Sequence, residues 1–298
     1  MMSTAELFQT IEQAIREATG EAFTLRNTQS VGGGCINSAY RLEGNTHSYF
    51  VKLNRKALLP MFEAEAEGLR EIASTQTVRA PLPVCCGVGG GQAFLVMENL
   101  SLKSGRGDCD RLLGQRLAAL HKIQQPFFGW HRDNTIGSSP QPNDRHDNWA
   151  GFWAARRLGF QLELAQSNGH GGRLQRDGEK LRERLPALLA GHDPQASLLH
   201  GDLWGGNYAA DETGQPVIFD PACYYGDREA DLAMTELFGG FGRDFYAAYR
   251  EAWPLDTGYP TRKILYNLYH IINHLNLFGG GYQGQAEGMI AQLLADLG

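Results

Sequence analysis

The segment from Leu198 to Asn207 constrains the fold of this chain more than any other part of it. It runs Leu-Leu-His-Gly-Asp-Leu-Trp-Gly-Gly-Asn, so Asn207 follows Asp202 by five positions. A carboxylate and an amide at this spacing fit on one turn, where both side chains can face the same ligand. A second aspartate, Asp220, follows the apolar run 217–219. We expect that run to be a short strand that ends near the turn.

A carboxylate, an amide and a second carboxylate in this order are typical of phosphotransferases. In kinases the first aspartate accepts the proton of the substrate hydroxyl, while the asparagine and the later aspartate bind the metal ions against the nucleotide phosphates. We therefore predict Asp202 as the catalytic base and Asn207 and Asp220 as ligands of Mg²⁺. We expect His200 to be structural, tying this loop to the metal-ligand loop. Asp231 is expected to cap or hydrogen-bond the catalytic loop from a helix start.

The composition indicates a globular protein large enough for two lobes. The chain has 298 residues, of which 42% are hydrophobic and 20% charged. Its formal net charge is -6 and it has no stripe of Lys or Arg, so nucleic acid is not an expected partner. Its five cysteines show no zinc spacing, which favours a reducing cytoplasm. No apolar leader or long apolar run is present, so we expect a cytoplasmic protein without a membrane partner.

The hydrophobic pattern changes near residue 100. Before it, an opening helix is followed by short alternating runs separated by glycine turns, with one further helix around residues 61–72. After it, helical spacing dominates, and residues 125–148 are expected to be an irregular surface stretch. The predicted fold class is α+β, with an antiparallel sheet lobe and a larger, mostly helical lobe. We assign residues 1–100 to nucleotide binding and residues 101–298 to catalysis and substrate binding. Predicted strands span 23–31, 39–42, 49–53, 84–88 and 93–97, and predicted later helices span 112–123, 149–164, 174–189, 232–238, 245–253, 264–278 and 289–297.

Lys52 interrupts the apolar strand Tyr49–Leu53. In a kinase such a lysine reaches the α and β phosphates and is held by a glutamate on the following helix. Glu63, Glu65 and Glu67 all lie on that helix, and residues two apart diverge by about 200°. We favour Glu65 as the partner because it lies nearer the predicted buried face, and Glu63 remains open.

Two further segments are candidates for nucleotide binding. The first is a predicted turn between strands, whose backbone amides could cover phosphates, although glycine content alone favours a simple hairpin turn. The second ends the last strand of the first lobe, where the adenine base would lie, and could equally be a plain junction. The residues concerned are Gly32, Gly33, Gly34, Cys35 and Asn37 in the turn, and Met97, Glu98 and Asn99 at the strand end.

At these residues the chain resembles the fructosamine kinase (ketosamine-3-kinase) family, a branch of the aminoglycoside and choline phosphotransferases with a protein-kinase-like fold. The resemblance implies transfer of phosphate from ATP to the 3-hydroxyl of a ketosamine, a sugar adduct on a small amine or a protein lysine. The 3-phosphate is unstable, so the amine is regenerated. The segments that carry the resemblance are Gly32–Asn37, Met61–Glu65, His200–Asn207, Asp220–Ala222, Tyr225–Gly226 with Glu229, Phe238–Phe241, and Asn273–His274 with Asn276.

The resemblance also suggests residues on the acceptor side. Trp204, beside the base, could form an aromatic wall for the sugar, with His274 and Asn276 as polar candidates, although an indole or a helical histidine is more often part of the packing. Cys35 is a candidate redox residue, which would make the protein a monomer or a redox-sensitive homodimer. The sequence leaves open which ketosamine sugar is used and whether whole glycated proteins are substrates.

Two other functions are compatible with the motifs. One is a kinase of the same group that acts on an aminoglycoside, choline, homoserine or methylthioribose. The other is a nucleotide-binding pseudokinase that serves as a sensor. Retention of Lys52, Asp202, Asn207 and Asp220 disfavours the pseudokinase.

Overall fold

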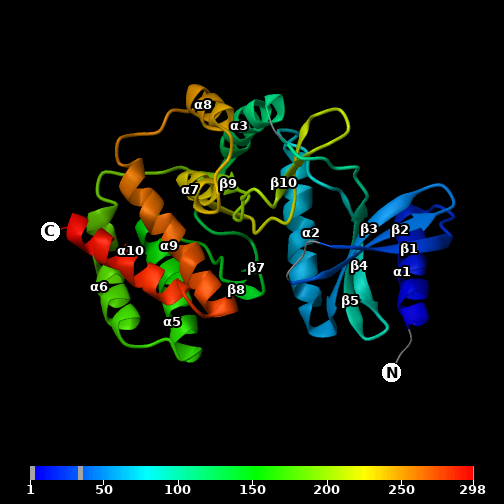
Figure 1. Ribbon diagram of the computed structural model, residues 1–298, viewed down its shortest axis with the longest axis horizontal. Coiled ribbons are helices and arrows are strands. Elements are labelled where there is room, and N and C mark those ends of the chain that lie inside the picture. Colours follow the sequence, from blue (N-terminus) through cyan, green and yellow to red (C-terminus); the bar gives the residue numbers. More distant parts are fainter. Residues whose placement is uncertain (1–3, 33–35, 106, 298) are drawn as a thin grey trace. The chain divides into compact units, whose positions relative to one another are not determined.

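The structure is a computed structural model that describes residues 4–32, 36–105 and 107–297 (Figure 1). The chain forms two compact units. The first comprises Met1–Gly105 and Ala209–Asp220, and the second comprises Arg106–Tyr208 and Pro221–Gly298. The short segment that ends at Asp220 therefore packs with the N-terminal part of the chain.

A five-stranded antiparallel sheet with the strand order β1-β2-β3-β5-β4 forms the centre of the first unit. Two helices pack against it, and a short 3-10 turn leads into the second of them. The strands are β1 (Leu25–Val31), β2 (Ser38–Gly44), β3 (Ser48–Arg55), β4 (Pro83–Gly89) and β5 (Gln92–Glu98), and the helical elements are α1 (Thr4–Thr19), η1 (Lys56–Leu58) and α2 (Leu59–Ser74).

The alternation of side chains along β3 separates the two faces of this sheet. Side chains two residues apart in a strand point to the same face. Tyr49, Val51 and Leu53 are buried in one hydrophobic cluster with the apolar residues of α1. Lys52 therefore lies on the opposite face, and it contacts α2 there through Glu65. The strand pattern thus sets the direction of this lysine.

A hairpin from later in the chain completes the first unit. It consists of β10 (Tyr208–Ala210) and β11 (Pro216–Ile218). Lys103 and Ala210 exchange two backbone hydrogen bonds of 2.8 Å, and the Ile218 amide donates to the Arg79 carbonyl at 3.0 Å. These bonds attach the hairpin, and with it Asp220, to the first unit.

The second unit is mainly helical. Its strands form a three-stranded antiparallel sheet, ordered β12-β9-β6, and a separate hairpin, β7-β8. The strands are β6 (Gln124–Gln125), β7 (Asn134–Ile136), β8 (Ser139–Gln141), β9 (Ala196–Leu199) and β12 (Tyr224–Gly226). The helices are α3 (Asp108–His121), α4 (Trp149–Phe152), the π-helix η2 (Trp153–Gly159), α5 (Phe160–Ser167), α6 (Arg173–Leu188), α7 (Glu229–Leu237), α8 (Arg243–Ala252), α9 (Tyr259–Phe278) and α10 (Tyr282–Asp296).

The predicted α+β class is confirmed, but one local prediction was wrong and another was incomplete. The predicted helix 149–164 lies in a continuous helical run over 149–167, and the π-helix η2 forms the middle of that run. Hydrophobic spacing does not distinguish a seven-residue π segment from an α-helix. The stretch 125–148, predicted to be irregular, contains the hairpin β7-β8. Strands of three residues are too short to show a period of two.

None of the helices in the described ranges of the chain combines the length and the apolar character needed to cross a membrane.

The packing of α3 against α8 yields a first prediction. A Cβ atom added to Gly114 of α3 would lie 2.3 Å from the carbonyl oxygen of Phe245 in α8. We therefore expect Gly114→Ala to lower the free energy of unfolding by about 1–3 kcal/mol, because backbone would have to move. Urea unfolding followed by circular dichroism measures this change.

The matched control is Gly288→Ala in α10, where an added Cβ would meet no atom of the described residues within 4 Å. This substitution should raise stability by up to about 1 kcal/mol through helix propensity. Equal stabilisation by both substitutions would contradict the close packing of α3 and α8.

Candidate functional site: a phosphotransferase centre

Lys52 is held between two carboxylates in the first unit. Its Nζ lies 2.5 Å from Glu65 Oε1 and 2.6 Å from Asp220 Oδ1. The lysine is 6% exposed, whereas the side chain of Asp220 is 46% exposed. Of the two glutamates left open by the sequence, Glu65 is the one that contacts Lys52, and Glu63 points to the exposed side of α2.

Lys52 keeps its positive charge in this environment. Burial by itself lowers the pKa of an ammonium group, but Asp220 and Glu65 act against it and raise the pKa of Lys52 above its ordinary value. A permanently protonated lysine provides a fixed cation beside the carboxylate of Asp220. Such a cation suits an anionic ligand such as a phosphate.

The predicted catalytic loop of the second unit begins where β9 ends. Asp231 in α7 anchors this loop through its backbone: Oδ2 accepts from the His200 amide at 2.7 Å and Oδ1 accepts from the Gly201 amide at 2.8 Å. His121 Nε2 lies 3.1 Å from the same Oδ2. Asp231 is 1% exposed, so all of these bonds are shielded from water. The predicted hydrogen bonding between this aspartate and the loop is therefore present in the structure, with the loop amides as donors.

The backbone of His200 joins the loop to the segment after Asp220. The Ala222 amide donates to the His200 carbonyl at 2.8 Å, while His200 Nδ1 accepts from the Asp202 amide at 3.2 Å. Gly201 has φ +81°, and a Cβ there would lie 2.1 Å from the Ala222 carbonyl oxygen. This position requires glycine, because both the dihedral angle and the close approach exclude a side chain.

Asp202 and Asn207 lie together on the loop, as their spacing suggests. Asn207 Nδ2 donates to the Asp202 carbonyl at 2.9 Å and to the Asp202 carboxylate at 3.3 Å. Asn207 is 6% exposed, and its backbone amide donates to the Trp204 carbonyl at 2.9 Å. With its Nδ2 engaged, Asn207 can offer Oδ1 to a cation.

The predicted metal ligands suit Mg²⁺ by their chemistry. This ion prefers oxygen ligands such as carboxylates and usually keeps several water molecules. Asp220 offers a half-exposed carboxylate in the first unit, and Asn207 offers an amide oxygen in the second. Both residues are therefore compatible with the ion.

The predicted nucleotide residues are only partly described. Gly33, Gly34 and Cys35 lie outside the described residues. Asn37 Oδ1 accepts from Asn54 Nδ2 at 2.7 Å, which joins the end of the turn to β3. A Cβ on Gly32 would meet no described atom within 4 Å, so its surroundings are open on the described side.

The end of β5, which was predicted to bind the adenine base, is held in place by side chains. Glu98 accepts from Arg79 Nη2 and from the Leu82 amide, both at 2.9 Å. Asn99 Nδ2 donates to Ser48 Oγ at 3.1 Å, and Met97 is buried. These contacts use the side chains of Glu98 and Asn99 to fix the backbone at the end of β5.

A run of aromatic rings extends from the catalytic loop to α9. Trp204 is 39% exposed, and its ring centroid lies 6.3 Å from that of Phe238 in an edge-to-face arrangement. The ring of Phe238 in turn lies 4.8 Å from His274. Phe238 was missed by the sequence reasoning as a site residue, although its segment carried the family resemblance. Its position beside Trp204 depends on the packing of α7 against α9.

The two acceptor candidates on α9 have different surroundings. His274 Nδ1 lies 2.8 Å from the His270 carbonyl, so this nitrogen carries the proton and Nε2 remains an acceptor. Burial lowers the pKa of His274, which favours this neutral form. Asn276, by contrast, donates to the side chain of Gln161 at 2.8 Å and accepts from Asn168 at 3.1 Å. These bonds tie Asn276 to α5 and to the residue that follows it.

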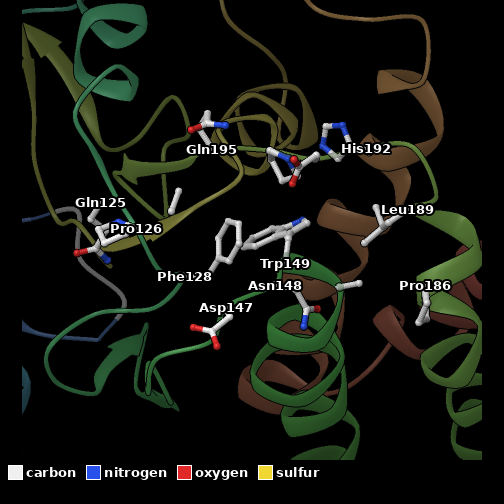
Figure 2. A pocket seen from close by; sticks show the side chains of 14 residues that line it. Gln125, Pro126, Phe128, Asp147, Asn148, Trp149, Pro186, Leu189, His192 and Gln195 are labelled. Carbon is white, nitrogen blue, oxygen red and sulfur yellow. The ribbon is translucent and has the colours of Figure 1, made fainter.

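A separate pocket of about 350 Å³ lies in the second unit (Figure 2). Phe128 and Trp149 form its centre, and His192 lies at one end. None of the residues that line it was predicted for the catalytic site. His192 Nε2 lies 2.6 Å from Asp227, and Trp149 Nε1 donates to the Tyr266 hydroxyl at 2.9 Å, so the polar atoms at its border are engaged with the fold.

A cluster next to this pocket has the composition of a metal site, but its carboxylates already pair with an arginine. Potential ligand atoms of His192, Glu229 and Asp256 lie within 4.8 Å of one another. Arg262 forms ion pairs with Glu229 at 2.6 Å and with Asp256 at 2.5 Å. The guanidinium group already pairs with both carboxylates, so we interpret the cluster as a structural ion-pair network.

Comparison with known proteins identifies the family. The chain matches the family model described as fructosamine kinase over residues 7–296. It belongs to the fructosamine kinase family. It is 51% identical to a protein of Synechocystis sp. named a probable ketoamine kinase, over 96% of this chain and 97% of that protein. It is 42% identical to the chloroplastic protein-ribulosamine 3-kinase of Oryza sativa subsp. japonica, over 92% of this chain and 81% of that protein.

Solved structures agree with this family assignment. A protein of Haemophilus somnus, provisionally named a fructosamine-3-kinase, superimposes with a TM-score of 0.90 at 30% identity, over 97% of this chain and 98% of that one. An aminoglycoside phosphotransferase solved with AMP-PNP and hygromycin B shares the fold alone, with a TM-score of 0.62 at 14% identity over 96% of this chain and 98% of that one. The predicted protein-kinase-like fold is therefore confirmed.

His270, which precedes His274 by four positions on α9, gives a prediction on the pH dependence of stability. His270 is 4% exposed, and its Nδ1 has no hydrogen-bond partner among the described residues. Burial lowers the pKa of His270 to about 3, with the charges of His274 and Arg157 acting in the same direction. In the unfolded chain a histidine titrates near pH ~6.5. Between these two pKa values the unfolded chain binds a proton at His270 that the folded protein does not bind. His270 therefore destabilises the folded state as the pH falls below ~6.5.

We therefore expect wild type to lose stability relative to His270→Gln when the pH falls from 7 to 5. The difference in the free energy of unfolding between the two proteins should change by about 2 kcal/mol, because one pKa unit corresponds to about 1.36 kcal/mol. Urea unfolding at both pH values measures it, with pH 7 against pH 8 as the internal control. A difference that stays constant down to pH 5 would show that His270 is not held neutral.

Proposed function

We propose that this protein is an ATP-dependent ketosamine-3-kinase. Its acceptor would be the 3-hydroxyl of a fructosamine or ribulosamine adduct on a small amine or a protein lysine. Family membership and the names of the relatives support this class of acceptor. The observation that carries the proposal is the joint placement of Asp202 and Asn207 on one loop, anchored by the buried Asp231.

Asp202 is the proposed base. Its carboxylate accepts from Asn207 Nδ2, and its amide donates to His200, so backbone and side chain are both held before substrate binds. A carboxylate in this position orients the acceptor hydroxyl and takes its proton as the new bond to phosphorus forms. Most of the rate enhancement in phosphoryl transfer comes from such positioning and from stabilisation of charge.

Lys52 is the proposed ligand of the nucleotide phosphates. Asp220 and Glu65 keep it charged, and their contacts limit the directions in which Nζ can point. Asn207 and Asp220 would hold Mg²⁺, which supplies neutralisation of the triphosphate charge when bound. Both residues would use oxygen atoms, in keeping with the preference of that ion.

Trp204 and His274 are the proposed acceptor residues. The indole offers a flat apolar face next to the base, and the neutral imidazole of His274 offers Nε2 as a hydrogen-bond acceptor for a sugar hydroxyl. Transfer to the 3-hydroxyl would yield a 3-phosphate that decomposes and releases the free amine. The protein would then act in deglycation.

The assignment of the base predicts the effect of Asp202→Asn. We expect kcat for transfer to fall by about 10²–10⁴-fold, because the amide cannot accept the proton. ATP binding, measured by calorimetry, should be unchanged, since Lys52 and Asp220 are retained. Asp193→Asn is the control, because Asp193 is an exposed loop residue of the same unit. Wild-type turnover by Asp202→Asn would refute the assigned base, and a wild type that binds ATP but transfers phosphate to no acceptor would indicate a pseudokinase.

The assignment of the acceptor predicts the outcome of a substrate screen. ATP consumption should rise with a ribulosamine or a fructosamine and stay at background with choline and with an aminoglycoside. Nuclear magnetic resonance of the product should locate the phosphate on sugar O3. Phosphate on another oxygen, or turnover with choline alone, would contradict the proposal.

In the same assay Trp204→Ala should raise the KM for the ketosamine by roughly tenfold, which corresponds to about 1.4 kcal/mol of lost contact. Ile123→Ala, which removes another exposed apolar side chain of the second unit, should leave the KM unchanged. An unchanged KM in Trp204→Ala would remove this residue from the acceptor site.

A further inference from the structure

Four buried polar side chains from residues 134–157 form a connected group in the second unit, which we call the polar brace. They are Asn134, Gln141, Asn143 and Arg157. Three of them are 0% exposed, and Asn134 is 9% exposed. Polar side chains this deeply buried are costly unless their hydrogen bonds are satisfied, so their partners are informative about what they hold in place.

The brace donates to the backbone that follows Asp220. Asn134 Nδ2 donates to the Cys223 carbonyl at 2.7 Å, and Gln141 Nε2 donates to the Ala222 carbonyl at 3.1 Å. Both carbonyls lie within three residues of Asp220 along the chain. Two successive peptide groups are therefore fixed by side chains of the hairpin β7-β8.

The orientation of each amide in the brace is set by its neighbours. Asn134 Oδ1 accepts from both Gln141 Nε2 and Asn143 Nδ2, each at 2.8 Å. Arg157 Nη2 donates to Asn143 Oδ1 at 2.7 Å. Because a guanidinium group can only donate, it fixes the direction of Asn143 and, through it, that of Asn134. The Asn134 Nδ2 group must then point to Cys223.

Two aromatic residues hold the ends of the brace. The Tyr269 hydroxyl of α9 donates to Gln141 Oε1 at 2.7 Å, which leaves Gln141 Nε2 for Ala222. The guanidinium carbon of Arg157 lies 4.0 Å from the ring centroid of Tyr224, the residue after Cys223. Arg157 thus contacts the same segment directly, through a cation–π interaction.

The backbone at Asp220 needs such support. Asp220 has φ +57°, one of two non-glycine residues in the described chain with a positive φ. This left-handed conformation is unfavourable for a residue with a side chain and persists where the surroundings fix it. On the C-terminal side, Ala222 is held from both directions: its amide donates to His200, and its carbonyl accepts from Gln141.

We propose that Asn134 and Gln141 are positioning residues for the metal ligand Asp220. Their hydrogen bonds to the Cys223 and Ala222 carbonyls fix the backbone after Asp220 and thereby the direction of its carboxylate. This inference rests on the proposed role of Asp220 in binding the metal–nucleotide complex. Residues that orient a metal ligand without contacting the metal typically contribute 10–100-fold to metal affinity, so the effect is measurable.

The test compares nucleotide binding with and without metal. Gln141→Met and Asn134→Leu keep the approximate size of each side chain but remove its hydrogen bonds. Calorimetry with AMP-PNP in EDTA should give wild-type affinity for both variants. With Mg²⁺ present, the gain in affinity should be about tenfold smaller than in wild type, and the Mg²⁺ concentration for half-maximal turnover should rise by a similar factor.

A pair of tyrosines on α9 provides a milder variant and its matched control. Tyr269→Phe removes the hydroxyl that orients Gln141 and should weaken Mg²⁺-dependent binding in the same direction, even if the larger changes prevent folding. Tyr266→Phe removes an equally buried hydroxyl of the same helix, which donates to Asp227 at 2.5 Å. It should lower stability without changing the metal dependence.

Equal Mg²⁺ dependence of Tyr269→Phe, Tyr266→Phe and wild type would overturn the proposal and leave the brace a purely structural network. The calorimetric result does not need an acceptor. A wild type that binds Mg²⁺ and nucleotide but phosphorylates no ketosamine would refute the proposed acceptor and leave this test intact.

Discussion

The hydrogen bonds that the buried carboxylate of Asp231 accepts are the interactions on which the loop from His200 to Asn207 depends. The carboxylate accepts hydrogen bonds from two successive backbone amides, those of His200 and Gly201, and it lies against His121. Burial by itself raises the pKa of Asp231, but the hydrogen bond and charge of His121 and the backbone bond of Gly201 lower it below the ordinary value. A charged group at this depth is tolerated because each oxygen is hydrogen-bonded. Separation of α7 from the loop would leave that charge uncompensated.

The same loop is connected to the segment after Asp220 through the backbone of one residue, Ala222. Ala222 donates to His200 and accepts from Gln141, and Gly201 packs against its carbonyl oxygen. The segment that carries the proposed base and the segment that follows the second aspartate are therefore held to each other by backbone atoms. Side chains such as Asp202 and Asn207 can then face a ligand without also having to support the fold.

The proposed phosphate-binding and acceptor parts of the site differ in how they are built. Lys52 and Asn207 are buried and held by charged or amide hydrogen bonds, which fix distances closely. Trp204, in contrast, is 39% exposed and contacts its neighbour Phe238 through ring edges. An exposed aromatic surface tolerates acceptors of different size, because stacking requires less exact geometry than a network of hydrogen bonds.

The sequence by itself determined the class of fold and predicted the chemistry of the site. Local patterns can be recognised in the sequence alone. In this chain they are the spacing of Asp202 and Asn207, the lysine in β3 and the helical periodicity after residue 100. The tertiary structure decided which glutamate contacts Lys52, and it revealed Phe238 beside Trp204 and the polar brace behind Asp220. Asn134 and Cys223 are 89 positions apart and meet only because a three-residue hairpin strand packs behind the loop. Contacts of this kind carry no periodic signal, since they depend on the packing of whole elements and not on the spacing of residues within one.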